Sequence, residues 1–200
     1  MSMNRRAFFA AGAAVLTFAA PRMALALTEE QAKALIELTI SDIRKLLREP
    51  GTSESRAPKL ETIMQERANV PLLARFSAGR AWREMSSGQK DNLVGAFSRY
   101  IAATYSRRFD EYSGDPDISL GNAIDAGRKG ILVESPINVP NREPIAVEWL
   151  VSDRGGRVEI VDLVIEGISM AATQREEIGA MLDKRNGDVD ALIEHLNTSL

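Results

Sequence analysis

The spacing of apolar residues changes twice along this chain, and the changes divide it into parts of different secondary structure. Before Pro116 apolar residues recur every three or four positions, as in amphipathic helices, and from there to Glu166 they follow the two-residue period of strands. Helical spacing returns after Gly167. Helices and strands segregated in this way predict an α+β fold, in which helices pack on one sheet.

Six helices are predicted. Capping boxes at Thr28–Gln31 and Ser86–Gln89 mark the starts of the first and the fourth helix. The third begins near Pro71, reaches Trp82 and is bent at Gly79. The predicted spans are 29–48, 55–67, 71–82, 86–112, 168–184 and 189–197.

Four strands are predicted between the two helical parts, at 117–125, 130–139, 143–151 and 157–166. The connections are short and rich in Gly, Asn, Asp and Pro, which favours antiparallel hairpins. The last strand is apolar on both faces (Val158, Ile160, Val161, Leu163, Val164, Ile165). Both faces are therefore expected to meet apolar groups, and on one of them the apolar group can belong to a ligand.

Residues 1–26 have the features of a secretory signal peptide. Arg5 and Arg6 precede an apolar run from Ala7 to Ala20, and Ala24-Leu25-Ala26 fits a small-x-small cleavage site. The paired arginines favour the twin-arginine type of export, with an ordinary Sec signal as the alternative. We therefore predict one exported domain, residues 27–200, in the bacterial periplasm.

Composition excludes several classes of function. The chain has no Cys and one His, so neither a zinc site nor a Cys-His pair can be assembled from the usual ligands. Without residues 1–26 it keeps 22 basic and 28 acidic residues, a net charge of −6, and no basic face suggests nucleic-acid binding. We predict no metal, no cofactor and no nucleic-acid partner.

One pair of carboxylates leaves an enzyme open as an alternative. Asp162 and Glu166 fall on one face of the last predicted strand, and paired carboxylates can act as acid and base. Polar groups at the end of a strand also serve solubility and turn formation, which is the interpretation we prefer. The prediction is a protein that is not an enzyme, with no catalytic residue.

Several short motifs, taken in order, resemble the MlaC or toluene-tolerance family, the auxiliary components of ABC transport systems that move phospholipids between the two membranes of Gram-negative bacteria. The first is Gly79-Arg80-Ala81-Trp82-Arg83 with Ser86 and Gln89, followed by Phe97 and Tyr105. The most specific is Ile160-Val161-Asp162 leading into Glu166-Gly167-Ile168-Ser169-Met170, with Arg175 beyond it.

The resemblance implies a cone-like fold, with helices on a strongly twisted four-stranded antiparallel sheet and an apolar cavity between them. It implies a monomeric periplasmic shuttle that carries phospholipid as cargo between an inner-membrane ABC transporter complex and an outer-membrane lipoprotein/porin complex. The longest predicted helix carries an aromatic stripe of Phe97, Tyr100, Tyr105, Phe109 and Tyr112. Periodicity alone assigns this stripe to an ordinary core, but the resemblance makes it a candidate cavity wall. The expected lipid-binding residues are Leu72, Phe76, Leu93, Phe97, Tyr100, Ile101, Tyr105, Phe109, Ile137, Val147, Trp149, Val151, Leu163 and Ile165.

The chain also departs from the family pattern. Val158 stands where the family usually has Trp, and Gln174-Arg175 stands where it often has Tyr-Arg. These differences leave room for a lipid other than an ordinary glycerophospholipid, including a hopanoid-associated paralogue. A cavity-bearing α+β enzyme and an interaction module with a solid core are the remaining alternatives.

Overall fold

The computed structural model describes residues 27–110, 117–138 and 143–199, with the side chains of residues 109 and 110 excepted. Residues 1–26, which carry the predicted signal peptide, lie outside this range. The helices of the described part are α1 (Glu29–Arg48), α2 (Ser53–Arg67), α3 (Val70–Ala78), α4 (Ser87–Asp110), α5 (Met170–Asp183) and α6 (Val189–Thr198), with 3-10 turns at Ala81–Arg83 and Gly127–Lys129.

The strands of the described part form two antiparallel sheets. The larger has five strands in the order β2 (Ala123–Asp125), β3 (Ile131–Glu134), β5 (Val147–Ser152), β6 (Glu159–Ile165) and β7 (Ile168–Ser169). A small ribbon joins β1 (Asp117–Ile118) to β4 (Ile137–Asn138). The mixed architecture is as predicted, but the prediction of a four-stranded sheet was wrong.

Local chemistry explains the different strand number. The predicted second strand is broken at Ser135-Pro136, where proline cannot donate to a ladder, so β3 and β4 belong to different sheets. At the other edge Glu166 and Gly167 both have positive φ, at 50° and 76°. Two such residues form a tight hairpin turn, and Ile168-Ser169 therefore folds back on β6 before α5 begins.

The helix starts follow the predicted capping signals. Thr28 and Gln31 exchange side-chain hydrogen bonds with each other's backbone N–H, and Ser86 and Gln89 do the same ahead of α4. The predicted third helix is shorter than expected, because Gly79 at φ +59° ends α3. The chain then continues as the 3-10 turn rather than as a bent helix. The predicted end of the fourth helix, at Tyr112, lies outside the described residues.

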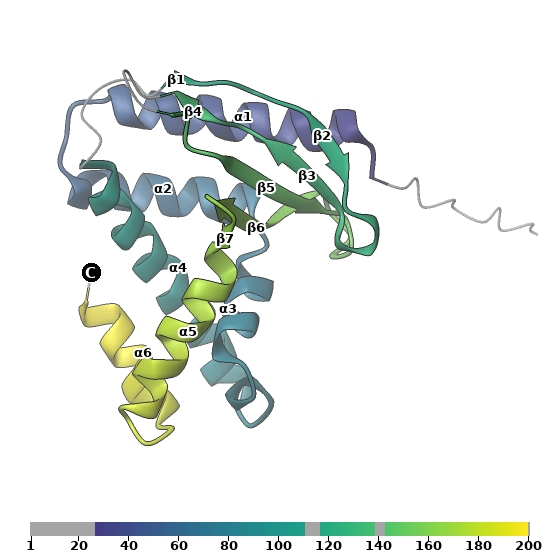
Figure 1. The fold of residues 1–200 in the computed structure, drawn as a ribbon. Helices are drawn as coiled ribbons and strands as arrows, with labels where there is room; N and C mark the ends of the chain where they lie inside the picture. The colour runs from purple at the N-terminus through teal and green to yellow at the C-terminus, as the bar shows by residue number, and fades with distance from the viewer. Residues whose placement is uncertain (1–26, 111–116, 139–142, 200) are drawn as a thin grey trace, which may run out of the picture.

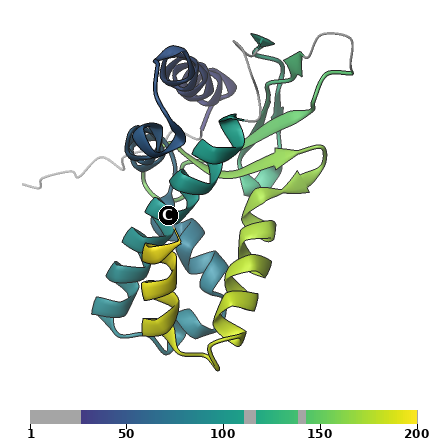
Figure 2. The same ribbon diagram turned by 90° about the vertical axis from the view of Figure 1, so that its left-hand side faces the viewer.

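Two main clusters of buried side chains hold the fold together. In the first, Ala32, Ile36 and Ile40 of α1 pack on the sheet against Val133 and Val151. In the second, α3, α4, α5 and α6 pack on one another around Leu93, Phe97, Ile178 and Leu192. Figures 1 and 2 show the result: α1 lies along the sheet with α2 beside it, and α3 to α6 extend away as a second lobe.

Candidate functional site

A cavity of about 260 Å³ lies between the sheet and the helices. Side chains from α1 to α5, β1, β4, β5 and β6 form its walls. The lining is apolar except for a few polar groups: Thr39, Ile43, Leu60, Ile63, Met64, Arg67, Ala68, Leu73, Ser77, Phe97, Ile101, Tyr105, Ile118, Ile137, Val147, Trp149, Ile160, Asp162, Leu163, Ile165, Met170, Ala171 and Gln174. A void with such walls suits hydrocarbon better than water.

The sheet wall follows from strand alternation and register. Val147 pairs with Ile165 and Trp149 pairs with Leu163 across β5 and β6, and all four line the cavity. Residues between them, such as Glu148 and Val164, point to the other face. The Trp149 indole N–H donates to the Ser135 hydroxyl at 2.7 Å, which leaves the ring available as an apolar surface.

The helical wall has a matching periodicity. Phe97, Ile101 and Tyr105 are spaced four residues apart on α4, so they lie on one face of the helix. Phe97 is 3% exposed and Ile101 is 6% exposed, which shows how little solvent reaches this wall. On α2 the lining residues Leu60, Ile63, Met64 and Arg67 also follow helical spacing.

The structure brings eight of the predicted lipid-binding residues together along this cavity: Phe97, Ile101, Tyr105, Ile137, Val147, Trp149, Leu163 and Ile165. Leu93 and Tyr100 lie in the core of the helical lobe, and Val151 lies in the core between α1 and the sheet. Leu72 and Phe76 are each 42% exposed on α3 and do not line the cavity. The side chain of Phe109 lies outside the described residues.

Sequence reasoning missed the wall that α1 and α2 provide. Thr39 and Ile43 of α1 and the Leu60-to-Arg67 face of α2 are part of the lining. The i, i+3, i+4, i+7 spacing of that α2 face was the available signal. It was weak because α2 is polar overall and carries Pro58.

The two carboxylates of the enzyme alternative both have backbone partners. Asp162 accepts from the Ser169 hydroxyl at 2.6 Å and from the N–H groups of Leu163 and Ala171 at 2.8 and 2.9 Å. Glu166 accepts from the backbone N–H of Ala146. Asp162 thus ties β6 to the first turn of α5, and Glu166 ties the β6–β7 turn to the chain ahead of β5.

Tyr105 is the titratable group of the wall whose pKa is clearly displaced. Burial raises the pKa of its phenol above the ordinary value of 10.0, and the nearby Arg108 guanidinium, 5.4 Å from the ring centre, opposes this shift. The hydroxyl is therefore held in its neutral, hydrogen-bonding form.

A pH prediction follows from this shift. A group whose pKa is raised by folding stabilises the native state at pH values below its pKa in the unfolded chain. That contribution is lost as the pH rises through the pKa of the folded state. The free energy of unfolding should therefore fall more steeply above about pH 10 in the wild type than in Tyr105→Phe. Urea titrations at several pH values measure this. Parallel pH profiles of the two proteins would contradict it.

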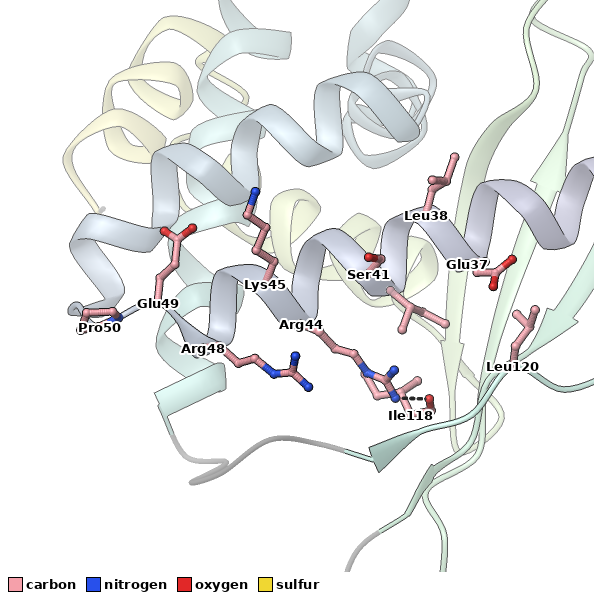
Figure 3. A pocket seen from close by; sticks show the side chains of 11 residues that line it. Glu37, Leu38, Ser41, Arg44, Lys45, Arg48, Glu49, Pro50, Ile118 and Leu120 are labelled. Atoms are coloured by element: carbon pink, nitrogen blue, oxygen red, sulfur yellow. Dashed lines mark hydrogen bonds between the residues drawn. The ribbon is translucent and has the colours of Figure 1, made fainter.

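A second hollow lies on the other side of α1 and has a different character. This groove, of about 930 Å³, runs between α1 and β1 and is shown in Figure 3, where Arg44 donates to the backbone carbonyl of Ile118. Charged side chains form much of its lining: Glu37, Arg44, Lys45, Arg48 and Glu49. Removing water from charged side chains costs free energy, so this groove does not suit hydrocarbon chains.

The described residues contain no cluster of His, Cys, Asp and Glu side chains that could hold a metal ion. Nor does any helix among them combine the length and the hydropathy that crossing a bilayer requires. Within that part of the chain, the apolar cavity is the feature with the clearest capacity to bind a ligand.

Comparison with known proteins relates this chain to a family and to a solved structure. The family model described as MlaC protein matches residues 33–198. Among solved structures, the chain resembles the phospholipid-binding protein from Ralstonia solanacearum in complex with a phospholipid, with a TM-score of 0.68 and 19% sequence identity. The match covers 84% of this chain and 96% of that one, and at this identity it shows a shared fold. Because the family model spans most of its length, this chain belongs to the MlaC family.

Proposed function

We propose that this protein is a phospholipid carrier that buries acyl chain in the cavity between its sheet and its helices. The observation that carries the proposal is the apolar cavity itself, lined by residues of α1 to α5, β1, β4, β5 and β6. Membership of the MlaC family and the fold shared with a phospholipid-binding protein support it. The proposed lipid-binding residues are the eight predicted residues that line the cavity, together with the α1 and α2 wall.

The volume of the cavity limits what the described conformation can hold. A dry protein cavity of about 150 Å³ accommodates benzene, which has six carbons. By that measure 260 Å³ holds roughly ten carbons, less than one ordinary acyl chain. Loading a diacyl lipid therefore requires the walls to move apart, and the unbranched side chains of Met64 and Met170 are suited to such rearrangement.

The energetics of transfer suit a carrier without chemistry. Each buried methylene is stabilised by about 0.8 kcal/mol relative to water, so ten methylenes contribute about 8 kcal/mol. An apolar cavity supplies this without nucleotide or cofactor. The direction of transport must then come from partners that bind the loaded and the empty forms with different affinity.

The cellular role that we propose rests on the sequence. The features of residues 1–26 support export to the periplasm, with residues 27–200 as a single monomeric domain. In this role the protein exchanges phospholipid with an inner-membrane ABC transporter complex and an outer-membrane lipoprotein/porin complex. A carrier is favoured over an enzyme because the hydrogen bonds of Asp162 and Glu166 to backbone groups give both carboxylates a structural role.

Native mass spectrometry of the protein purified from a bacterial periplasm tests the proposal. We expect a fraction of molecules to carry one bound lipid, and organic extraction with fragmentation identifies it as a phospholipid. A protein that is always empty and takes up no lipid from phospholipid vesicles would contradict the proposal. Recovery of a hopanoid alone would replace the phospholipid assignment.

A further inference from the structure

Three uncharged polar side chains project into the apolar cavity with hydrogen-bonding capacity that is not used. They are Ser77 on α3, Tyr105 on α4 and Gln174 on α5. Ser77 is 2% exposed and Gln174 is 5% exposed. The Ser77 hydroxyl, the Tyr105 hydroxyl and the side-chain carbonyl of Gln174 are buried, and none of these atoms makes a hydrogen bond of normal geometry within the described residues.

Contacts between the helices join the elements that carry these three groups. The Arg175 guanidinium donates to the backbone carbonyl of Phe76 at 3.1 Å, which ties α3, the helix of Ser77, to α5, the helix of Gln174. Gln174 also lies within reach of the Tyr105 hydroxyl, where a weak hydrogen-bonding interaction lowers the pKa of the phenol against the larger effect of burial. Three helices thus contribute one polar group each to the lining of the same cavity.

The charged groups of the wall each have at least one partner in the protein, although the Nε of Arg67 is also buried without one. Asp162 accepts three hydrogen bonds from the start of α5 and its own strand, and Arg67 donates to Asp42 at 2.9 Å. A buried polar group without a partner costs folding free energy, so three in one cavity indicate that something else satisfies them. Because the three groups are uncharged and lie in an apolar space, an uncharged polar group that reaches into the cavity is the partner that suits them.

We propose that Ser77, Tyr105 and Gln174 form a subsite for an acyl ester of the bound lipid. The carbonyl oxygen of the ester has two lone pairs, and any two of the three side chains can fill them: the hydroxyls as donors, or the Gln174 amide by turning to present its NH₂. The ester is the uncharged polar group at which acyl chain joins the rest of a phospholipid. The subsite therefore sets how deeply the chain enters the cavity, an inference that rests on the proposed function.

A comparison of ester-linked with ether-linked phospholipid of the same headgroup and chain length tests the subsite. The ether lipid lacks the carbonyl oxygen and is otherwise closely similar. Delipidated wild-type protein is offered both lipids in vesicles, and native mass spectrometry measures the ratio bound. We expect about a tenfold preference for the ester lipid, the effect of one to two net hydrogen bonds.

Variants then assign the preference to the three side chains. Ser77→Ala, Tyr105→Phe and Gln174→Met should each reduce it severalfold, while the ether lipid still binds. Ser106→Ala is the matched control, because the Ser106 hydroxyl is also buried without a partner but Ser106 does not line the cavity. This control should keep the preference of the wild type.

The outcomes separate the subsite from the carrier function. Equal binding of both lipids by the wild type, as expected if water satisfied the three groups, would overturn the subsite and leave the carrier intact. Binding of neither lipid would overturn both. The assignment would also be overturned if the ester preference survived the loss of all three groups. The same holds if the protein preferred a lipid with a hydroxylated chain over the ester lipid.

Discussion

Replacing Leu163 with Asp is expected to lower lipid affinity at least a hundredfold. Leu163 lies on β6 opposite Trp149, and both side chains form the sheet wall of the cavity. A carboxylate at this position would lose its hydration when an acyl chain bound beside it. The effective free-energy penalty for desolvating such a charge is several kcal/mol. Since about 1.4 kcal/mol corresponds to a factor of ten, two orders of magnitude is a conservative expectation.

The neighbouring residue provides a stringent control for this result. Val164 points to the other face of the sheet, opposite Glu148, and does not line the cavity. Val164→Asp places like charges across the strands and should cost up to about 1 kcal/mol of stability, yet it should retain lipid. Titration of each delipidated variant with a fluorescent phospholipid gives the affinities. Equal affinity of Leu163→Asp and the wild type would remove this wall from the lipid site.

Most helices were predictable because their signals are local. The capping boxes at Thr28 and Ser86 place the beginnings of α1 and α4, and the side-chain bonds that they predict are present. The end of α3 was not predicted, although the signal was there. Gly79 adopts a positive φ, which ends the helix. In the sequence, a single glycine is equally compatible with a helix end and with a bend.

The sheet was harder to predict than the helices, because strand pairing depends on distant residues. The two-residue period predicted strands over β5 and β6, and Val147 and Trp149 at that spacing both line the cavity. It could not show that Ile168-Ser169 would pair with β6, because this pairing depends on the backbone conformation of Glu166 and Gly167. Nor could it show that Pro136 would divide one predicted strand between two sheets.

The cavity divides the predicted lipid-binding residues according to their position along each element. On α4 the predicted stripe extends beyond the cavity, so Phe97, Ile101 and Tyr105 line it while Leu93, one turn earlier, packs in the helical core. On β5 Val147 and Trp149 line the cavity, whereas Val151 is covered by α1 beyond a bulge. Periodicity identifies the face of an element, but only tertiary packing decides which part of that face is hollow.

Replacing Asp162 with Ala is expected to lower the free energy of unfolding of the delipidated protein by about 3 kcal/mol. The carboxylate accepts three hydrogen bonds, and two of the donors, the Ser169 hydroxyl and the Ala171 N–H, belong to the start of α5. Hydrogen bonds to charged groups contribute about 1.5–3 kcal/mol each, and water can replace part of them at this partly exposed site. Urea unfolding followed by circular dichroism measures the loss.

The delipidated state is essential for this measurement, because bound lipid adds stability that would vary with occupancy. Asp162→Asn is the matched variant: it keeps one acceptor oxygen and the volume of the side chain, and it should lose about half as much stability. The two variants also separate the structural role of Asp162 from the acid–base alternative. If the role of Asp162 is structural, the free energy of unfolding should fall in proportion to the number of hydrogen bonds removed. An acid or base predicts variants as stable as the wild type, and that result would reopen the possibility of chemistry in the cavity.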